Sequence, residues 1–220
     1  MFDSPAPEDE ENMIFTLKQV DRVCSISLTV TNSLLEKLTA ISEPPSELED
    51  LILFSPDNSR LTLPRTFLGE SRFRTLHLTG VAFPSVLQLL SPCHDLVDLQ
   101  LYEIPSVGYF SPDAFANALS GMTLLRSLSL HFVSFPPRRN FVSLPPHSEE
   151  RVVLLALRCL KYQGTSKYLD RFVARIDALR LGDIDITFFS QPTKDASQLG
   201  VIYRADMNSD MAQPSRRSCL

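Results

Sequence analysis

Hydrophobic positions along the chain recur in a six-residue template, L-x-x-L-x-L, with other apolar residues replacing leucine in some copies. Copies begin at Val23 (VCSISL), Leu48 (LEDLIL), Phe73 (FRTLHL), Leu96 (LVDLQL), Leu125 (LRSLSL), Leu157 (LRCLKY) and Leu181 (LGDIDI). The steps between successive starts are 25, 25, 23, 29, 32 and 24 residues. A proline-rich insertion, residues 135–147, accounts for the longest step. The fourth and sixth template residues would point inward from a short strand, and the first would anchor the turn before it.

One such strand cannot bury its apolar side alone, so successive strands must stack and share a core. The spacing of the template is typical of leucine-rich repeats. It predicts an α/β fold, an irregular leucine-rich-repeat solenoid with a curved parallel sheet of about seven short strands and convex-side helices or turns. The alternative is a conventional α/β domain with leucine-rich strands, but β-branched runs and glycine-rich turns after strands are missing from the sequence.

Segments between the template copies supply the connections that parallel strands require. Residues 31–41 are amphipathic at helical spacing. Ser111, Pro112 and Asp113 form a good helix start, with serine as the N-cap and proline at the first position. Residues 166–176 predict another helix, with Leu169, Phe172, Val173 and Ile176 on one side.

Regular leucine-rich repeats place Asn or Cys three residues after the template to hydrogen-bond the turn. The corresponding positions of this chain hold Thr31, Pro56, Val81, Ile104, Val133, Thr165 and Phe189. We therefore expect the turns to be irregular and to be hydrogen-bonded in another way.

The composition is typical of a folded protein, and the charge does not favour a polyanionic partner. Hydrophobic residues make up 44% and charged residues 21%, which is ordinary for a globular domain. The net charge of −5 favours no nucleic-acid partner. Sixteen prolines against seven glycines indicate many stiff connections between short elements. The longest apolar run, residues 152–157, is too short to cross a bilayer, so no membrane partner is expected.

Cysteine usage and the start of the chain indicate a cytoplasmic or nuclear protein. The acidic first ten residues lack the basic and apolar segments of a signal peptide. Four cysteines are widely spaced, and two of them fall within apolar strand-like runs. We expect buried reduced thiols rather than disulfides at Cys24, Cys93, Cys159 and Cys219.

The domain organisation follows from where the template copies stop. Residues 1–8 are expected to be a disordered acidic N-terminus, residues 9–205 the leucine-rich-repeat domain, and residues 206–220 a disordered polar tail. Residues 12–20 predict a short helix that caps the first repeat. Few apolar residues remain to cover the last strand, namely Leu199, Val201, Ile202 and Tyr203. We expect self-association through the strand edge at residues 184–189.

No catalytic motif such as GxSxG, HExxH, GxGxxG or Walker A occurs in the chain. His77, Asp98 and Ser129 should share one side of the sheet but lack an oxyanion-hole sequence, so a catalytic triad is not favoured. His147, Glu149 and Glu150 fall in a proline-flanked segment and are interpreted as an exposed loop. We expect no enzyme activity, no cofactor and no metal.

Function should reside in the third, fifth and seventh template residues, which line the concave side of the predicted sheet. A protein partner of unknown identity is expected, with Phe54 and Tyr102 as aromatic anchors. The alternative is a solvated surface on which the following loop covers Ile52 and Phe54. The expected partner-binding residues are Asp50, Ile52, Phe54, His77, Asp98, Gln100, Tyr102, Ser129, His131, Lys161, Asp183 and Asp185.

Several phrases of the chain resemble a large group of fungal proteins. These phrases are DRVC from residue 21, LHLTGVAFP from residue 76, LQLYEIP from residue 99, ALSGM from residue 118 and IDITFF from residue 184. The chain resembles the F-box/leucine-rich-repeat-like proteins of mushroom-forming fungi over roughly residues 9–197. The resemblance implies kinship with substrate receptors of SCF ubiquitin ligases, in which an F-box docks to the Skp1 adaptor. No F-box is recognisable before the first repeat, so docking to Skp1 is not expected, and a truncated scaffold without a partner is the alternative function.

Overall fold

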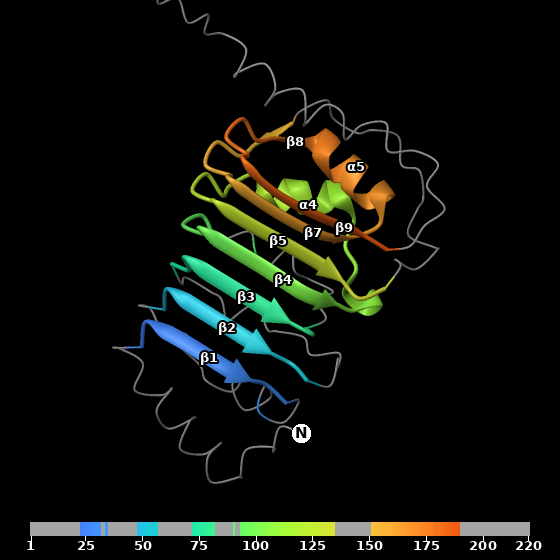
Figure 1. Ribbon diagram of the computed structural model, residues 1–220. Helices are drawn as coiled ribbons and strands as arrows, with labels where there is room; N and C mark the ends of the chain where they lie inside the picture. The colour runs from blue at the N-terminus through green and yellow to red at the C-terminus, as the bar shows by residue number, and fades with distance from the viewer. Residues whose placement is uncertain are drawn as a thin grey trace, which may run out of the picture.

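The main feature of the molecule is a seven-stranded parallel sheet whose strands follow chain order, β1-β2-β3-β4-β5-β7-β9 (Figure 1). The computed structural model describes residues 23–31, 34, 48–56, 72–81, 90, 93–134 and 151–189. Each strand begins two residues after the start of a template copy, so the predicted set of seven parallel strands is confirmed. The strands are β1 (Ser25–Thr29), β2 (Asp50–Phe54), β3 (Thr75–Thr79), β4 (Asp98–Ile104), β5 (Ser127–Phe132), β7 (Cys159–Gly164) and β9 (Asp183–Phe188).

Backbone carbonyls at the second template position join each copy to the next. The oxygen of Cys24 accepts the N–H groups of Glu49 and Asp50, at 2.9 and 3.0 Å. A carbonyl oxygen has two lone pairs and can accept both donors. The arrangement holds neighbouring copies in register, so equal template positions lie side by side. It recurs at the carbonyl oxygens of Glu49, Arg74, Val97, Arg126 and Arg158.

Two helices lie on one side of the sheet, behind its later strands in Figure 1. Helix α4 (Pro112–Leu119) begins as predicted, because the Ser111 hydroxyl accepts the N–H of Ala114 at 3.2 Å. Helix α5 (Ser166–Arg175) ends one residue earlier than predicted and is capped by Thr165, whose hydroxyl accepts the N–H of Tyr168 at 3.3 Å.

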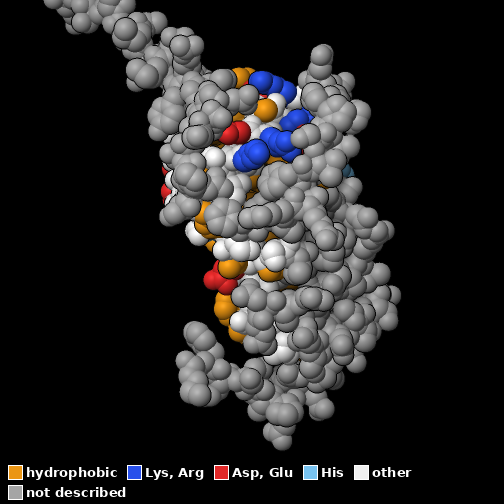
Figure 2. Space-filling view, turned by 90° about the vertical axis from the view of Figure 1, so that its right-hand side faces the viewer, with side chains coloured by type: hydrophobic (Ala, Val, Ile, Leu, Met, Phe, Trp, Pro, Cys, Tyr) orange, Lys and Arg blue, Asp and Glu red, His pale blue; other side chains and the backbone are white. Residues whose placement is uncertain are grey.

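The apolar side of each helix points to the sheet, and the other side of α5 is charged. Leu169 and Phe172 of α5 are buried, as predicted, and Val173 is partly buried. Lysine and arginine side chains gather at the height of this helix in Figure 2, and α5 contributes Lys167 and Arg171. The helix is therefore amphipathic, with its polar side toward solvent.

Threonine replaces the missing asparagine at two of the turns. Thr165 caps α5, and the Thr31 hydroxyl accepts the N–H of Leu34 at 3.2 Å. The expectation that the turns use other hydrogen bonds is therefore met at these two positions. Apart from Thr31 and Leu34, the helix predicted for residues 31–41 lies outside the described residues.

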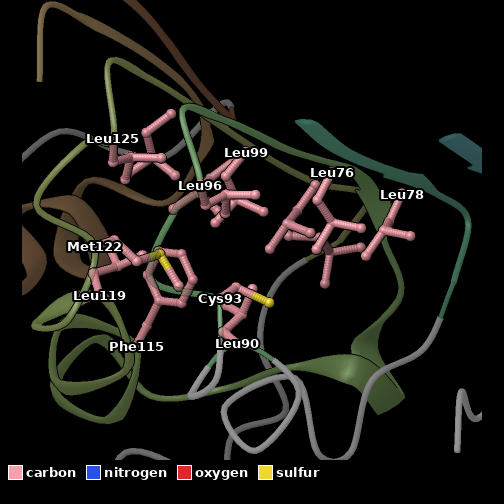
Figure 3. Close-up of a cluster of buried hydrophobic side chains, with 14 of the residues drawn as sticks. Leu76, Leu78, Leu90, Cys93, Leu96, Leu99, Phe115, Leu119, Met122 and Leu125 are labelled. Carbon is pink, nitrogen blue, oxygen red and sulfur yellow. The ribbon is translucent and has the colours of Figure 1, made fainter. Parts of the chain in front are cut away.

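The first, fourth and sixth template residues form the core between the sheet and the helices. Figure 3 shows Leu76 and Leu99 on the side of the sheet that faces Phe115 and Leu119 of α4. Burial weakens at the last strand, where Ile184 and Ile186 are only partly buried. The fourth residues are almost inaccessible across the middle of the sheet, at 1% exposure or less for Leu51, Leu76, Leu99, Leu128 and Leu160.

A second, two-stranded parallel sheet was not predicted. It pairs β6 (Val152–Val153) with β8 (Ile176–Asp177), and the N–H of Leu154 donates to the oxygen of Asp177 at 2.8 Å. The run of apolar residues from 152 therefore contributes a short strand that fixes the exit of α5.

The cysteine prediction is only partly right. Cys93 is buried, and burial raises the pKa of its thiol to about 11. Cys24 is exposed and Cys159 is partly buried. The expectation of a buried thiol is therefore wrong for Cys24.

Other predictions lie outside the described residues. They concern residues 1–8, the capping helix at 12–20, the proline-rich insertion, the loop with His147, Glu149 and Glu150, the apolar residues Leu199, Val201, Ile202 and Tyr203, Cys219, and the tail at 206–220.

A cluster of aromatic side chains leaves no room beside Gly164, at the end of β7. The Tyr162 hydroxyl donates to the carbonyl oxygen of Thr165 at 2.8 Å, which fixes its ring. Tyr162 also stacks on Tyr168, with ring centroids 6.1 Å apart. A Cβ atom at Gly164 would lie 2.7 Å from Cζ of Tyr162 and 3.1 Å from the ring of Phe132. Glycine is therefore required by packing at this position.

We expect Gly164→Ala to lower the free energy of unfolding by about 1–3 kcal/mol, as overpacking of a well-filled core does. The matched control is Gly182→Ala, because no atom lies within 4 Å of a Cβ built there. Urea denaturation followed by circular dichroism measures both variants. Equal stabilities of the two variants would contradict the packing account.

Candidate functional site

The sheet surface opposite α4 and α5, called here the open face, carries three rows of side chains held in register. The amino row is formed by the third template residues, Ser25, Asp50, Thr75, Asp98, Ser127, Cys159 and Asp183. The middle row is formed by Ser27, Ile52, His77, Gln100, Ser129, Lys161 and Asp185. The carboxyl row is formed by Thr29, Phe54, Thr79, Tyr102, His131, Gln163 and Thr187. All twelve predicted partner-binding residues fall in these rows.

Eleven of the twelve are exposed or partly exposed, and Ser129 is the exception. Its side chain is 1% exposed, so the prediction that it offers a contact surface is wrong. Ser129 stands in register between Gln100 and Lys161, whose side chains are much longer. A short side chain between two long ones is shielded from solvent although it points to the open face.

A polar cluster centred on Asp98 links the amino and middle rows. Oδ2 of Asp98 accepts the side-chain N–H of Gln100 at 2.8 Å and lies 3.0 Å from Nε2 of His77. The side chains of His77 and Asp98 are about a quarter exposed, at 24% and 27%. A contact that water reaches this well adds about 1 kcal/mol at most to stability, even between charged groups, so the cluster mainly orients its members.

The same geometry separates the three residues considered for a catalytic triad. Gln100 stands between His77 and Ser129 in register. The backbones that carry the imidazole and the hydroxyl are therefore two strand spacings apart, roughly 10 Å. Asp98 and His77 are paired, whereas Ser129 stands on the far side of Gln100.

Apolar side chains are exposed at the β2 end of the open face. Ile52 is 36% exposed and Phe54 is 37% exposed. The loop that follows them, residues 57–71, lies outside the described residues, so the alternative in which that loop covers both side chains stays a prediction. Exposed apolar groups among polar ones are a common feature of binding surfaces.

Charges of both signs occupy the β7–β9 end. Lys161 and Asp185 stand in register on neighbouring strands. Sγ of Cys159 donates to Oδ2 of Asp183 at 3.4 Å. Burial raises the pKa of the Cys159 thiol, and the Asp183 carboxylate raises it further.

Tyr102 and His131 form the centre of the carboxyl row. Their rings are T-shaped, with centroids 4.3 Å apart. Burial lowers the pKa of His131, while Asp185 raises it and Lys161 lowers it. The imidazole is therefore held in its neutral form at neutral pH.

A cavity of about 600 Å³ opens beside the carboxyl row. Tyr102 and His131 are among the predicted binding residues, and Thr79 and Gln163 are seventh template residues of the predicted concave side. Glu103, Phe132 and Val133 are not predicted from the template. The cavity is lined by Thr79, Tyr102, Glu103, His131, Phe132, Val133 and Gln163.

Glu103 reaches the open face because β4 contains a bulge. Leu101 pairs with Leu130 and Ile104 pairs with Phe132, so two residues of β4 stand opposite His131 alone. Regular alternation would turn Glu103 toward the core, whereas the bulge leaves it exposed and buries Ile104 at 3% exposure. In this position Glu103 has a left-handed backbone, with φ at 52°. This conformation costs a residue other than glycine about 1–2 kcal/mol.

The sequence carries a signal for this bulge. Leu101 and the next buried residue, Ile104, are three positions apart instead of two, and two polar residues stand between them. The preceding copy has the same spacing from Leu78 to Val81, with Gly80 in the left-handed position at φ 69°.

Comparison of the chain with protein-family models, with curated proteins and with solved structures found no match. Over the described ranges, no helix is long and apolar enough to cross a membrane. No three His, Cys, Asp or Glu side chains of the described residues are grouped as metal ligands would be.

We expect Asp185→Asn to lower the pKa of His131, because the carboxylate that favours the imidazolium is removed. Lys161→Met should raise it, because a repelling ammonium is removed. Both changes are measured by NMR titration of the His131 ring protons between pH 4 and 8. Shifts in the same direction for the two variants would contradict the assigned charge environment.

Proposed function

We propose that the chain is an irregular leucine-rich-repeat solenoid that binds another protein through its open face and catalyses no reaction. Support for the solenoid comes from the repeated carbonyl at the second template position, which accepts the same two N–H groups in six successive copies. Such nearest-neighbour contacts are what stacked repeats require.

The observation that carries the binding function is the carboxyl row. Phe54, Tyr102 and His131 present aromatic side chains on three strands of one surface, and Phe54 is 37% exposed. Aromatic side chains supply most of the affinity of protein interfaces when a partner covers them. Thr79, between Phe54 and Tyr102, and Gln163, next to His131, offer hydrogen bonds, which a partner needs for orientation.

The register of the sheet supports a preformed surface. In the middle of the sheet, the outward side chains are held by strands whose inward neighbours are almost fully buried, as Leu99 and Leu101 are on either side of Gln100. A partner would therefore meet side chains whose backbone is already ordered, which reduces the entropic cost of binding.

We expect the double variant Phe54→Ala/Tyr102→Ala to weaken partner binding about 10-fold to 100-fold, since the loss of each aromatic anchor costs about 1 kcal/mol or more. The measurement is affinity capture with the purified protein, followed by titration of the partner that is recovered. The matched control is Leu124→Ala/Leu179→Ala, which removes two side chains that are 50% and 77% exposed outside the open face.

The outcomes separate the candidate functions. Equal loss of binding in both double variants would contradict a site on the open face. A wild-type protein that captures no specific partner would support the alternative, a truncated scaffold. Recovery of Skp1 would support kinship with the substrate receptors of SCF ubiquitin ligases.

A further inference from the structure

Glu103 occupies a backbone position that suits glycine, and the neighbouring copy of the template shows this directly. Glu103 and Gly80 are both the eighth residue counted from the template start, and both have a left-handed backbone, at φ 52° and φ 69°. The N–H of Gly80 donates to the oxygen of Tyr102 at 3.0 Å, so the two turns lie side by side. The fold therefore tolerates glycine in this conformation, and a glutamate is present where it brings strain.

The bulge places the Glu103 carboxylate beside an aromatic wall. Tyr102 and Glu103 are consecutive residues that both line the cavity, and the ring of His131 meets Tyr102 at a centroid distance of 4.3 Å. Without the extra residue in β4, the glutamate would alternate to the buried side of the sheet. The strained backbone thus brings a negative charge to the rim of an aromatic cavity.

The remaining lining residues are uncharged: Phe132 and Val133 are apolar, and Thr79 and Gln163 carry hydrogen-bond acceptors. Thr79 offers a hydroxyl oxygen and Gln163 an amide oxygen. The described residues that line the cavity include one carboxylate and no lysine or arginine. Lys161 is close enough to act on His131, but Asp185 acts on the same ring with the opposite sign, and the two stand in register.

We propose that this cavity binds the cationic side chain of a partner protein, an arginine or a lysine. Glu103 pairs with the positive group, and the face of Tyr102 adds a cation–π contact. The oxygens of Thr79 and Gln163 accept the remaining N–H donors. Burial holds His131 neutral, so the imidazole does not repel the cation. That the cation comes from a protein rests on the proposed function, whereas the chemistry of the cavity does not.

NMR titration with a small probe tests this without a partner. The probe is N-acetyl-arginine N-methylamide, and its neutral control is the citrulline compound, which has nearly the same shape. We expect saturable shifts of the amides of Thr79, Tyr102, His131 and Gln163 with arginine and a dissociation constant at least about 10-fold weaker with citrulline. The matching lysine compound is a second cationic probe that is expected to move the same amides. Equal binding of arginine and citrulline would overturn the proposal.

Two substitutions at one position separate binding from folding. Glu103→Gln keeps the shape and should weaken the arginine probe about 10-fold, whereas Glu49→Gln, a control at another exposed glutamate, should leave it unchanged. Glu103→Gly should abolish probe binding and raise the urea midpoint, because glycine relieves the left-handed strain. A lower midpoint for Glu103→Gly would show that the glutamate is structural and would overturn the assignment.

The probe also distinguishes this inference from the proposed function. Partner capture that depends on Phe54 and Tyr102, together with no response to the arginine probe, would contradict the cation site alone. A response to arginine that is lost in Glu103→Gln would support the cation site even if no partner were captured.

Discussion

A backbone carbonyl that accepts two N–H groups from the next template copy is the contact on which the rest of the structure depends. It occurs at the second template residue, from Cys24 to Arg158, and it fixes the register of each strand on its neighbour. Because side chains alternate along a strand, a slip of one residue would exchange the two faces of the sheet. The repeated carbonyl therefore keeps the leucines on one side and leaves the other side free for the three rows.

The two faces of the sheet have different roles, one in the core and one at the surface. Leu51, Leu76, Leu99, Leu128 and Leu160 form one almost inaccessible row of the core. The burial declines at β9, where Ile184 and Ile186 are partly buried and Phe188 is 36% exposed. Strand β9 pairs with β7 on one side, and among the described residues no strand pairs with its other edge. Self-association through residues 184–189 stays a prediction, and this edge is where it would occur.

The sequence predicted what depends on repetition and on local chemistry. The template predicted the starts of all seven strands, because the same spacing of apolar residues recurs in every copy. Ser111 with Pro112 predicted the start of α4. What was missed depends on irregularity or on neighbours. The burial of Ser129 depends on the lengths of the Gln100 and Lys161 side chains. These residues belong to the two neighbouring strands, and only the register of the sheet brings them to either side of Ser129. The position of Glu103 depends on a single extra residue in β4. The spacing from Leu101 to Ile104 indicates this bulge in the sequence. The pairing of β6 with β8 joins two short segments that lack the template altogether.

Site-specific photo-cross-linking tests the central claim, that the open face is the binding surface, most directly. A photoreactive phenylalanine derivative is introduced at Tyr102 on the open face or at Ala174, an exposed position of α5. The protein is then irradiated in cells that express it, and covalent adducts are identified by mass spectrometry. The account predicts one specific protein adduct from position 102 and none from position 174. The same adduct from position 174 alone would contradict it.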